Sequence, residues 1–257
     1  MAAPDIPSEL TEVASHFQQN ARTPFSRRAA TAIVVLSDGT LVPGVRVESA
    51  SFPLTIPAAL NAITTAVASG RKDIVGLYHQ GAVPPSTTVL AAGFGLSPAA
   101  QGGVWSSPSG MPAPGNVIDP YIRAPEEGTA AAVEAAREVA ERAHIPESNF
   151  PVGAVLQTES GRWLPGVNVE HPDWASILCA ERNALGTAVT FGERSRSMMA
   201  LCCPKAPGAS PCGGCRQLLA ELAPGIVVWM DQGASSPLGM TPAELIPLAF
   251  SGDSLGS

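Results

Sequence analysis

The sequence predicts an α/β fold made of two tandem α/β/α domains, each with a mixed sheet flanked by helices. Apolar strand-like runs alternate with helical stretches, and the same order of elements occurs twice at a constant offset of 122 residues. The chain has 257 residues, of which 45% are hydrophobic and 14% charged, so it can bury two cores. Its 25 glycines and 25 prolines predict short elements with many turns.

The repeat is visible when the chain is compared with itself. Residues 24–70 align with 146–192 without a gap, with 16 identities in 47 positions. The identical pairs include Gly39/Gly161, Pro43/Pro165, Gly44/Gly166, Glu48/Glu170, Ala58/Ala180 and Asn61/Asn183. Shared turn residues and apolar periodicity indicate the same local fold twice, which we interpret as an ancient gene duplication.

The two copies supply matching elements in chain order. Each copy begins with an amphipathic helix, the second rich in Ala and Glu, followed by a β-branched or aliphatic strand and a glycine turn. The expected elements are helices near 8–20 and 128–144, strands at 32–36 and 153–156, strands near 45–48 and 167–170, helices from about 57 and 179, and strands at 74–78 and 199–203. The second copy adds a helix from 212 and a strand at 226–230.

The stretch 97–127 is rich in Ser, Gly, Pro and Ala, which is typical of a linker or a long surface loop. The expected organisation is therefore a first domain over 1–98, a linker over 99–127 and a second domain over 128–257.

The charge and the termini limit the classes of partner. The formal net charge is −7, with a pI near 5.1. Such a chain lacks the basic surface that a nucleic-acid polymer or an anionic membrane requires, so a small, nearly neutral ligand fits better. The N-terminal residues have neither the basic start nor the apolar core of a signal peptide, and no apolar run is long enough to span a bilayer. We therefore expect a cytoplasmic protein.

The five cysteines all lie in the second half, and their clustering predicts a metal site. Cys179 precedes one expected helix, and the Cys212–Cys215 pair begins another. Three thiolates would leave the fourth tetrahedral position of a zinc ion open for water, as in catalytic zinc sites. Glu181, two residues after the first cysteine, could approach that water as a proton carrier.

Two other uses of these cysteines remain open at this point. A CxxC pair in a reduced compartment can be a redox couple. Alternatively, Cys202 or Cys203 could supply a fourth ligand and close a purely structural zinc site.

The pattern Cys179-Ala180-Glu181-Arg182 with Pro211–Gln217 downstream resembles the zinc deaminases, and its three cysteines resemble the free-nucleoside cytidine deaminases. The resemblance extends over most of 128–250, including residues 150–154, 168–170 and 245–250. It implies that Phe150 stacks on the pyrimidine, that Asn168 and Glu170 hold the ribose hydroxyls, and that the backbone N–H of Ala180 meets the base carbonyl. Arg182, and less directly Gln217, would offset the negative charge of the thiolates.

The implied activity is hydrolytic deamination of cytidine and deoxycytidine to uridine and deoxyuridine plus ammonia, in pyrimidine salvage, with one Zn²⁺ per chain. The first copy has Pro57 and Ala59 in place of Cys179 and Glu181, and no cysteine, so it cannot form this metal site. By the same resemblance, two such chains would form a homodimer that imitates a four-domain assembly.

One departure from the family pattern affects substrate preference. The family continues its ribose motif as Asn-x-Glu-Asn-Ala, whereas this chain has Asn-Val-Glu-His-Pro-Asp-Trp over 168–174. The alternatives are therefore a deaminase of a modified cytosine nucleoside and an inactive, zinc-stabilised binding protein. Deamination of a base within RNA or DNA is disfavoured by the acidic charge.

Overall fold

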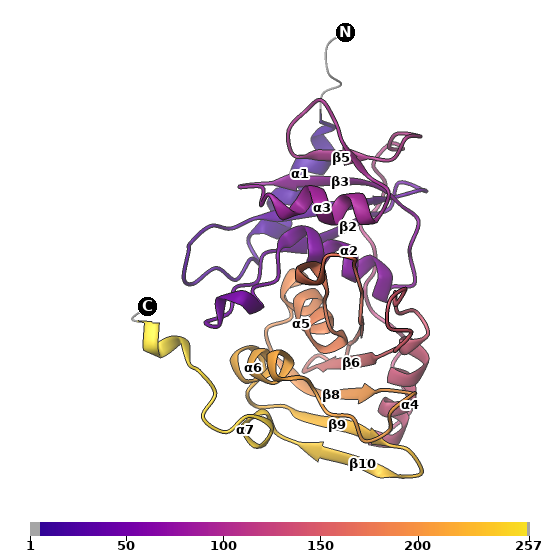
Figure 1. Ribbon diagram of the computed structural model, residues 1–257, viewed down its shortest axis with the longest axis vertical. Helices are drawn as coiled ribbons and strands as arrows, with labels where there is room; N and C mark the ends of the chain where they lie inside the picture. The colour runs from indigo at the N-terminus through magenta and orange to yellow at the C-terminus, as the bar shows by residue number, and fades with distance from the viewer. Residues whose placement is uncertain (1–5, 256–257) are drawn as a thin grey trace.

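The structure is a computed structural model that describes residues 6–255. It confirms the α/β class and two α/β/α units, one from each half of the chain. In Figure 1 the two sheets lie at opposite ends of the long axis, with α2 and α5 between them. No helix among these residues has the length and apolar character needed to cross a bilayer.

The first half forms a five-stranded sheet of order β2-β1-β3-β5-β4. Its elements are α1 (Ser8–Gln18), β1 (Thr31–Leu36), β2 (Leu41–Val45), η1 (Phe52–Leu54), α2 (Ala58–Ala68), β3 (Ile74–Gln80), α3 (Ser86–Gly93), β4 (Ser97–Pro98) and β5 (Val104–Ser106). Leu10 and Ala14 of α1 pack on one face, against Ile33 and Val35. The core that contains α2 covers the other face.

The second half forms a sheet of order β10-β9-β8-β6-β7. Its elements are α4 (Thr129–Ala140), β6 (Gly153–Thr158), β7 (Trp163–Val167), η2 (Trp174–Ser176), α5 (Ala180–Thr190), β8 (Arg196–Cys202), α6 (Gly213–Leu222), β9 (Val227–Gln232), β10 (Ser235–Met240), α7 (Pro242–Leu245) and η3 (Gly252–Leu255). Val133, Ala136 and Val139 of α4 pack on one face of this sheet against Val155, and α5 covers the other.

The offset of 122 residues holds in the structure for β1/β6, β2/β7, η1/η2, α2/α5 and β3/β8. Even the irregularities agree, because the register shifts between Val35 and Leu36 in one copy and between Gln157 and Thr158 in the other. The second strands begin earlier than the expected 45–48 and 167–170, because the turns at Gly39 and Gly161 are tight. Both glycines have a positive φ, 87° and 83°, which residues with a Cβ rarely adopt.

Strand direction distinguishes the two sheets. The second sheet is mixed as expected, because α6 crosses between β8 and β9 and makes them parallel. In the first sheet every pair is antiparallel, which corrects the expectation of a mixed sheet there. The reason is that β5 returns beside β3 in the opposite direction. Because β5 lies within 99–127, part of the segment expected to be a linker belongs to the first sheet.

The two halves share one apolar core in which α2 and α5 meet. At the centre, the hydroxyl groups of the equivalent residues Thr65 and Thr187 are hydrogen-bonded at 2.8 Å. Asn61 Nδ2 donates across the boundary to Gly186 O at 3.1 Å. This shared layer fixes each half relative to the other and positions the N-terminus of α5.

Candidate active site

The three cysteines predicted as metal ligands lie together. The Sγ atoms of Cys179, Cys212 and Cys215 all lie within 4.8 Å of one another. The Cys179–Cys212 separation is 3.9 Å and the Cys212–Cys215 separation is 3.4 Å. Tetrahedral ligands at a Zn–S distance of about 2.3 Å lie about 3.8 Å apart, so the cluster fits a zinc ion with little adjustment.

Helix N-termini position these sulfurs. Cys179 is the N-cap of α5 and Cys212 is the N-cap of α6, both with extended backbone, while Cys215 lies in the first turn of α6. Free N–H groups and the positive end of the helix dipole favour thiolate at such positions. Contacts with the Cys179 and Cys215 sulfurs lower the pKa of the Cys212 thiol. Contact with Cys212 raises the pKa of Cys179, and contacts with Cys179 and Cys212 raise that of Cys215.

Cys202 and Cys203 are not part of the ligand cluster found among residues 6–255. Cys202 is fully buried and donates to Asp231 at 3.1 Å. Cys203 lines the cavity beside the cluster, and burial raises the pKa of its thiol to about 11. The structural-zinc alternative therefore lacks a fourth sulfur in place.

Glu181 lies in the first turn of α5, with a side chain that is only 3% exposed. It lines the same cavity as Cys179 and Cys212, and it is not a member of the ligand cluster. Burial raises the pKa of its carboxyl group to about 7, and the negative charge of Cys212 acts in the same direction. A buried carboxyl group that can bind or release a proton near neutral pH suits general acid–base catalysis.

These groups open onto a cavity of about 660 Å³, which is within the usual range for small-molecule sites. The residues that line it are Glu147, Ser148, Phe150, Val152, Asn168, Glu170, Trp174, Ile177, Leu178, Cys179, Ala180, Glu181, Leu201, Cys203, Ala209, Ser210 and Cys212. The four residues predicted to bind substrate, Phe150, Asn168, Glu170 and Ala180, are thus all on its wall. Ala180 is the first residue of α5, where a backbone N–H has no partner within the helix.

Asn168 and Glu170 also hold the wall of the cavity together. Asn168 accepts from Val152 N at 2.8 Å and donates to Phe150 O at 2.9 Å. Glu170 accepts from Glu147 N and Ser148 N at 2.9 and 3.0 Å and from the Ser148 hydroxyl. Sequence reasoning had assigned both residues to the sugar; the structure adds that they position the loop that carries Phe150.

Arg182 of α5 makes a hydrogen bond to the first half of the chain. Its Nη2 donates to Leu54 O in the first half at 3.0 Å, and its buried Nε has no hydrogen-bond partner among the described residues. Arg182 therefore links α5 to the first half, and its charge-offsetting role toward the thiolates stays a prediction. Leu54 is distant from Arg182 in sequence, so the spacing of residues along α5 could not predict this hydrogen bond.

Gln217 of α6 makes its hydrogen bonds within α6 and to the C-terminal segment. It donates to Phe250 O at 2.7 Å and accepts from Phe250 N at 3.3 Å, and it contacts Glu221. Gln217 therefore anchors the C-terminal segment to α6.

Sequence reasoning missed the contribution of residues 49–55 to the metal loop. A Cβ on Gly214, between the two cysteines of α6, would lie 2.9 Å from Leu54 Cδ2, so this side chain occupies the space that a glycine leaves. Glu221 of α6 accepts from Ser49 Oγ at 2.7 Å and from Ala50 N at 2.8 Å. The first half has no cysteine and is called the metal-free half below. It packs directly against α6, the helix that carries two of the sulfurs.

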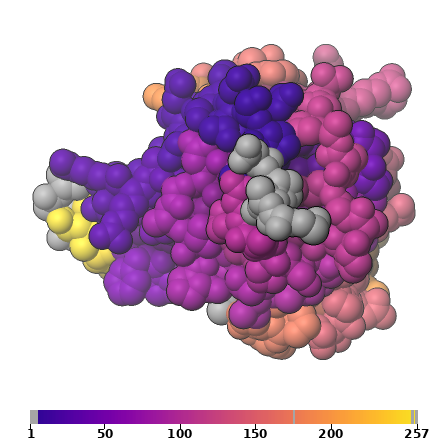
Figure 2. All heavy atoms as spheres, turned by 90° about the horizontal axis from the view of Figure 1, so that it is seen from above, coloured from indigo at the N-terminus to yellow at the C-terminus, as the bar shows by residue number. Residues whose placement is uncertain are grey.

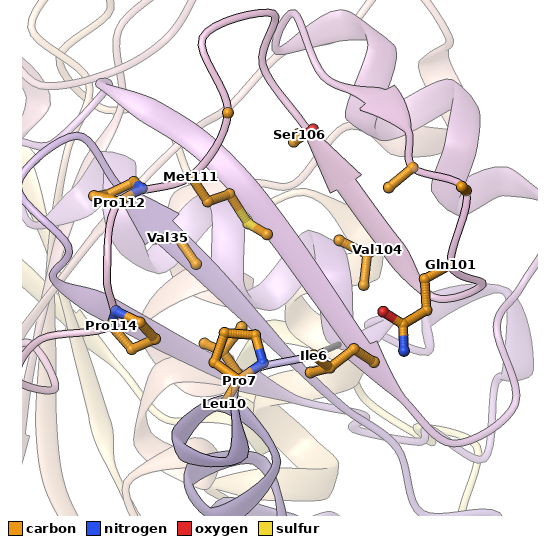
Figure 3. A pocket seen from close by; sticks show the side chains of 13 residues that line it. Ile6, Pro7, Leu10, Val35, Gln101, Val104, Ser106, Met111, Pro112 and Pro114 are labelled. Carbon is orange, nitrogen blue, oxygen red and sulfur yellow. The ribbon is translucent and has the colours of Figure 1, made fainter. Parts of the chain in front are cut away.

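A second cavity, of about 300 Å³, lies in the first half on the α1 side of its sheet. Figure 3 shows Ile6, Leu10, Val104 and Met111 among the side chains around it. Its lining includes no acid, base or thiol. It therefore carries none of the groups that the chemistry of the first cavity needs.

Comparison with known proteins agrees with this site. Residues 127–231 match the family model described as cytidine and deoxycytidylate deaminase zinc-binding region. The cytidine deaminase of Sporosarcina psychrophila is 38% identical over 120 residues, which cover 46% of this chain and 88% of that protein. That of Halalkalibacterium halodurans is 33% identical over 124 residues, covering 48% and 94%. A solved cytidine deaminase from Burkholderia pseudomallei, 35% identical, covers 48% of this chain and 100% of its own with a TM-score of 0.46.

The matched region contains the three cysteines and the buried glutamate, so the fold and the site define a zinc-binding deaminase domain. The chain belongs to the cytidine deaminase family, whose members are hydrolases that act on C–N bonds.

Proposed function

We propose that the protein deaminates cytidine and deoxycytidine to uridine and deoxyuridine, releasing ammonia. The observation that carries this proposal is a cluster of three sulfurs, two of which line a cavity together with the buried carboxyl group of Glu181. Cys179, Cys212 and Cys215 would hold Zn²⁺, one ion per chain, and the ion would supply an acidified water molecule at neutral pH.

Glu181 is the proposed proton carrier. Its carboxylate accepts a proton from water and delivers it to N3 of cytosine as the water oxygen bonds to C4. It then passes the second proton to the amino group, and the C4–N bond breaks to release ammonia. Its burial supports this role, because a carboxyl group with a pKa of about 7 exchanges protons readily in both directions.

The substrate would lie along the cavity wall. Phe150 would stack on the pyrimidine, and the N–H of Ala180 would donate to the base carbonyl. Glu170 would accept from a ribose hydroxyl, since each carboxylate oxygen can accept more than one hydrogen bond. Asn168 Nδ2 has a second hydrogen for the same purpose, beyond the one it gives to Phe150 O.

We further infer that the two halves arose by gene duplication and that the chain works as a cytoplasmic homodimer in pyrimidine salvage. The equivalent residues Phe52 and Trp174 support a dimer, because their side chains are 81% and 79% exposed, which is unusual for aromatic side chains outside an interface. The constant offset supports duplication. Sedimentation of an active monomer would contradict the dimer.

Loss of ultraviolet absorbance over a panel of cytidine, deoxycytidine, modified cytosine nucleosides and a cytosine oligonucleotide tests the activity. We expect turnover of the two free nucleosides and none of the oligonucleotide. One equivalent of zinc with no turnover of any nucleoside would instead favour an inactive binding protein, and turnover confined to a modified nucleoside would favour that alternative.

A further inference from the structure

The loop that follows Glu170 departs from the family pattern, and in the structure it is held by the metal-free half. His171 is only 4% exposed, and its Nδ1 accepts from Asp173 N at 3.0 Å. Since Nδ1 accepts, the ring hydrogen lies on Nε2, which is buried without a hydrogen-bond partner among the described residues.

The imidazole ring lies against the last residue of α3. A Cβ on Gly93 would come within 2.2 Å of His171 Nε2 and 2.4 Å of Cδ2, so glycine is what allows the ring to reach this helix. The next residue, Phe94, packs against His144, with ring centroids 5.6 Å apart. The end of α3 therefore touches two segments of the second half.

Those two segments frame the sugar side of the proposed site. His144 N donates to Asn168 O at 3.2 Å, and Glu170 N donates to His144 O at 2.8 Å. The loop after His171 then carries Trp174, whose indole is 79% exposed and lines the cavity. A displacement of His171 would be transmitted to Glu170 on one side and to Trp174 on the other.

We propose that the metal-free half sets nucleoside affinity and sugar selectivity through the contact of Gly93 with His171, which positions the loop 170–176 as one wall of the cavity. His171 and Gly93 are positioning residues, and Trp174 is the residue of this loop that meets the sugar side of the substrate. The proposal rests on the function proposed above, but its structural part concerns this chain's own loop.

The test is Gly93→Ala, with Gly102→Ala as the matched control because a Cβ at Gly102 meets no atom within 4 Å. We expect KM for cytidine to rise by about tenfold in Gly93→Ala, with a changed ratio of kcat/KM between cytidine and deoxycytidine. The control should behave as wild type, and zinc content and kcat should change by less than about twofold in both variants. An unchanged KM in folded Gly93→Ala would overturn the proposal.

A double-mutant cycle keeps the test decisive. In the His171→Ala background the added Gly93→Ala change should have no further effect, because the clashing ring is gone. An equal effect in both backgrounds would show that Gly93 acts by another route. If Gly93→Ala does not fold, the comparison of His171→Ala with wild type decides the matter, with KM expected to rise and an unchanged KM counting against the proposal.

Fluorescence provides a readout that needs no turnover. Trp174→Phe is used to isolate the Trp174 emission by difference, and we expect Gly93→Ala and His171→Ala to alter its wavelength and its quenching by acrylamide. If wild-type protein with bound zinc deaminates no nucleoside, the proposed function fails, while this measurement still judges the coupling. A Trp174 emission in Gly93→Ala and His171→Ala that is identical to that of wild type would refute it.

Discussion

The two halves of this chain share the order of their central elements, but only the second half has the residues of the candidate site. Their strands and central helices correspond at one offset, down to the same register shift. At the N-terminus of the central helix, however, the second half has Cys179 and Glu181 where the first has Pro57 and Ala59. The comparison shows that the fold needs turns, packing and a shared helix layer, and that it forms without the cysteines and the glutamate of the candidate site.

The same comparison separates structural from substrate-binding roles. Glu48 accepts from Phe25 N and Ser26 N, each at 3.1 Å, and from the Ser26 hydroxyl. Glu170 makes the equivalent three contacts at the equivalent positions. In the first half, which has no metal cluster among its described residues, this carboxylate holds the loop and also pairs with Arg46 at 3.0 Å. In the second half the loop role and the proposed sugar contact coincide.

The first half also supports the active one. Residues 49–55 pack against α6, and the end of α3 packs against the loop after Glu170. In Figure 2 the first half forms most of the face seen from above, with parts of the second half at its edges. The first half therefore packs against the segments that carry the candidate site, although it lacks the cysteines and the glutamate of that site.

The largest expected effect is on turnover. Glu181→Gln should lower kcat for cytidine by about 10²–10⁴-fold, since the amide cannot carry a proton, while zinc content is unchanged. The control is Glu48→Gln, which makes the same chemical change in the metal-free half and should leave kcat near wild type. Steady-state kinetics and metal analysis check both. Substantial turnover by Glu181→Gln would remove this residue from its role.

The next effect is on the interface between the halves. Gly186→Ala should lower the free energy of unfolding by about 1–3 kcal/mol, because the new Cβ would lie 2.6 Å from Asn61 Oδ1 in a closed core. The equivalent position in the first half is Thr64, whose hydroxyl donates to Asn61 O at 3.2 Å within its own helix. Thr64→Ala should cost only about 1 kcal/mol. Denaturant titration measures both, and equal costs would contradict the distinction.

A comparable loss of stability is expected for Glu48→Gln and Glu170→Gln, about 1–3 kcal/mol each, because backbone donors lose a charged acceptor. Only Glu170→Gln should also raise KM. Burial acts to raise the pKa of both carboxyl groups. The hydrogen bonds from Ser26 or Ser148 and the neighbouring backbone N–H groups, together with Arg46 for Glu48 and His144 for Glu170, lower the pKa below the ordinary 4.5.

A lowered pKa in the folded state fixes the sign of the pH effect. The stabilisation is complete above the unfolded value of 4.5 and is lost as pH falls through the lower folded values. Unfolding measured between pH 6 and about 3 should therefore show a shallower acid loss in either glutamine variant than in wild type. An identical pH profile would contradict the assignment.

The smallest expected effect concerns His79, which occupies the position equivalent to Leu201 of the active cavity. Burial lowers the pKa of His79 to about 4 from 6.5, and its Nδ1 has no hydrogen-bond partner among the described residues. The unfolded chain binds this proton more readily, so stability falls as pH drops from 6.5 towards 4.

His79→Leu should therefore change stability at pH 7 by less than about 1 kcal/mol and reduce the acid loss between pH 6.5 and 4. The measurement is the unfolding midpoint at several pH values. A variant that is as acid-sensitive as wild type in this range would show that other groups dominate.

Local sequence patterns predicted several features of the fold. Glycine turns, the helix starts at 57 and 179 and the repeat itself follow from neighbouring residues, and the structure agrees with them. Helix α3 and strand β10 were not expected, because α3 is short and its sequence has little apolar periodicity, while β10 owes its strand state to pairing with β9.

The sequence by itself determined the fold class, the duplication of elements, the three clustered cysteines and the glutamate beside them, because these depend on spacing within one element or between adjacent ones. Only the tertiary structure decided that Arg182 donates to Leu54 O, that Gln217 binds Phe250, and that His171 rests on Gly93. Each of these contacts joins segments that are far apart in the chain. Which groups meet there depends on how the folded core packs the segments together. No periodicity in the sequence encodes that choice.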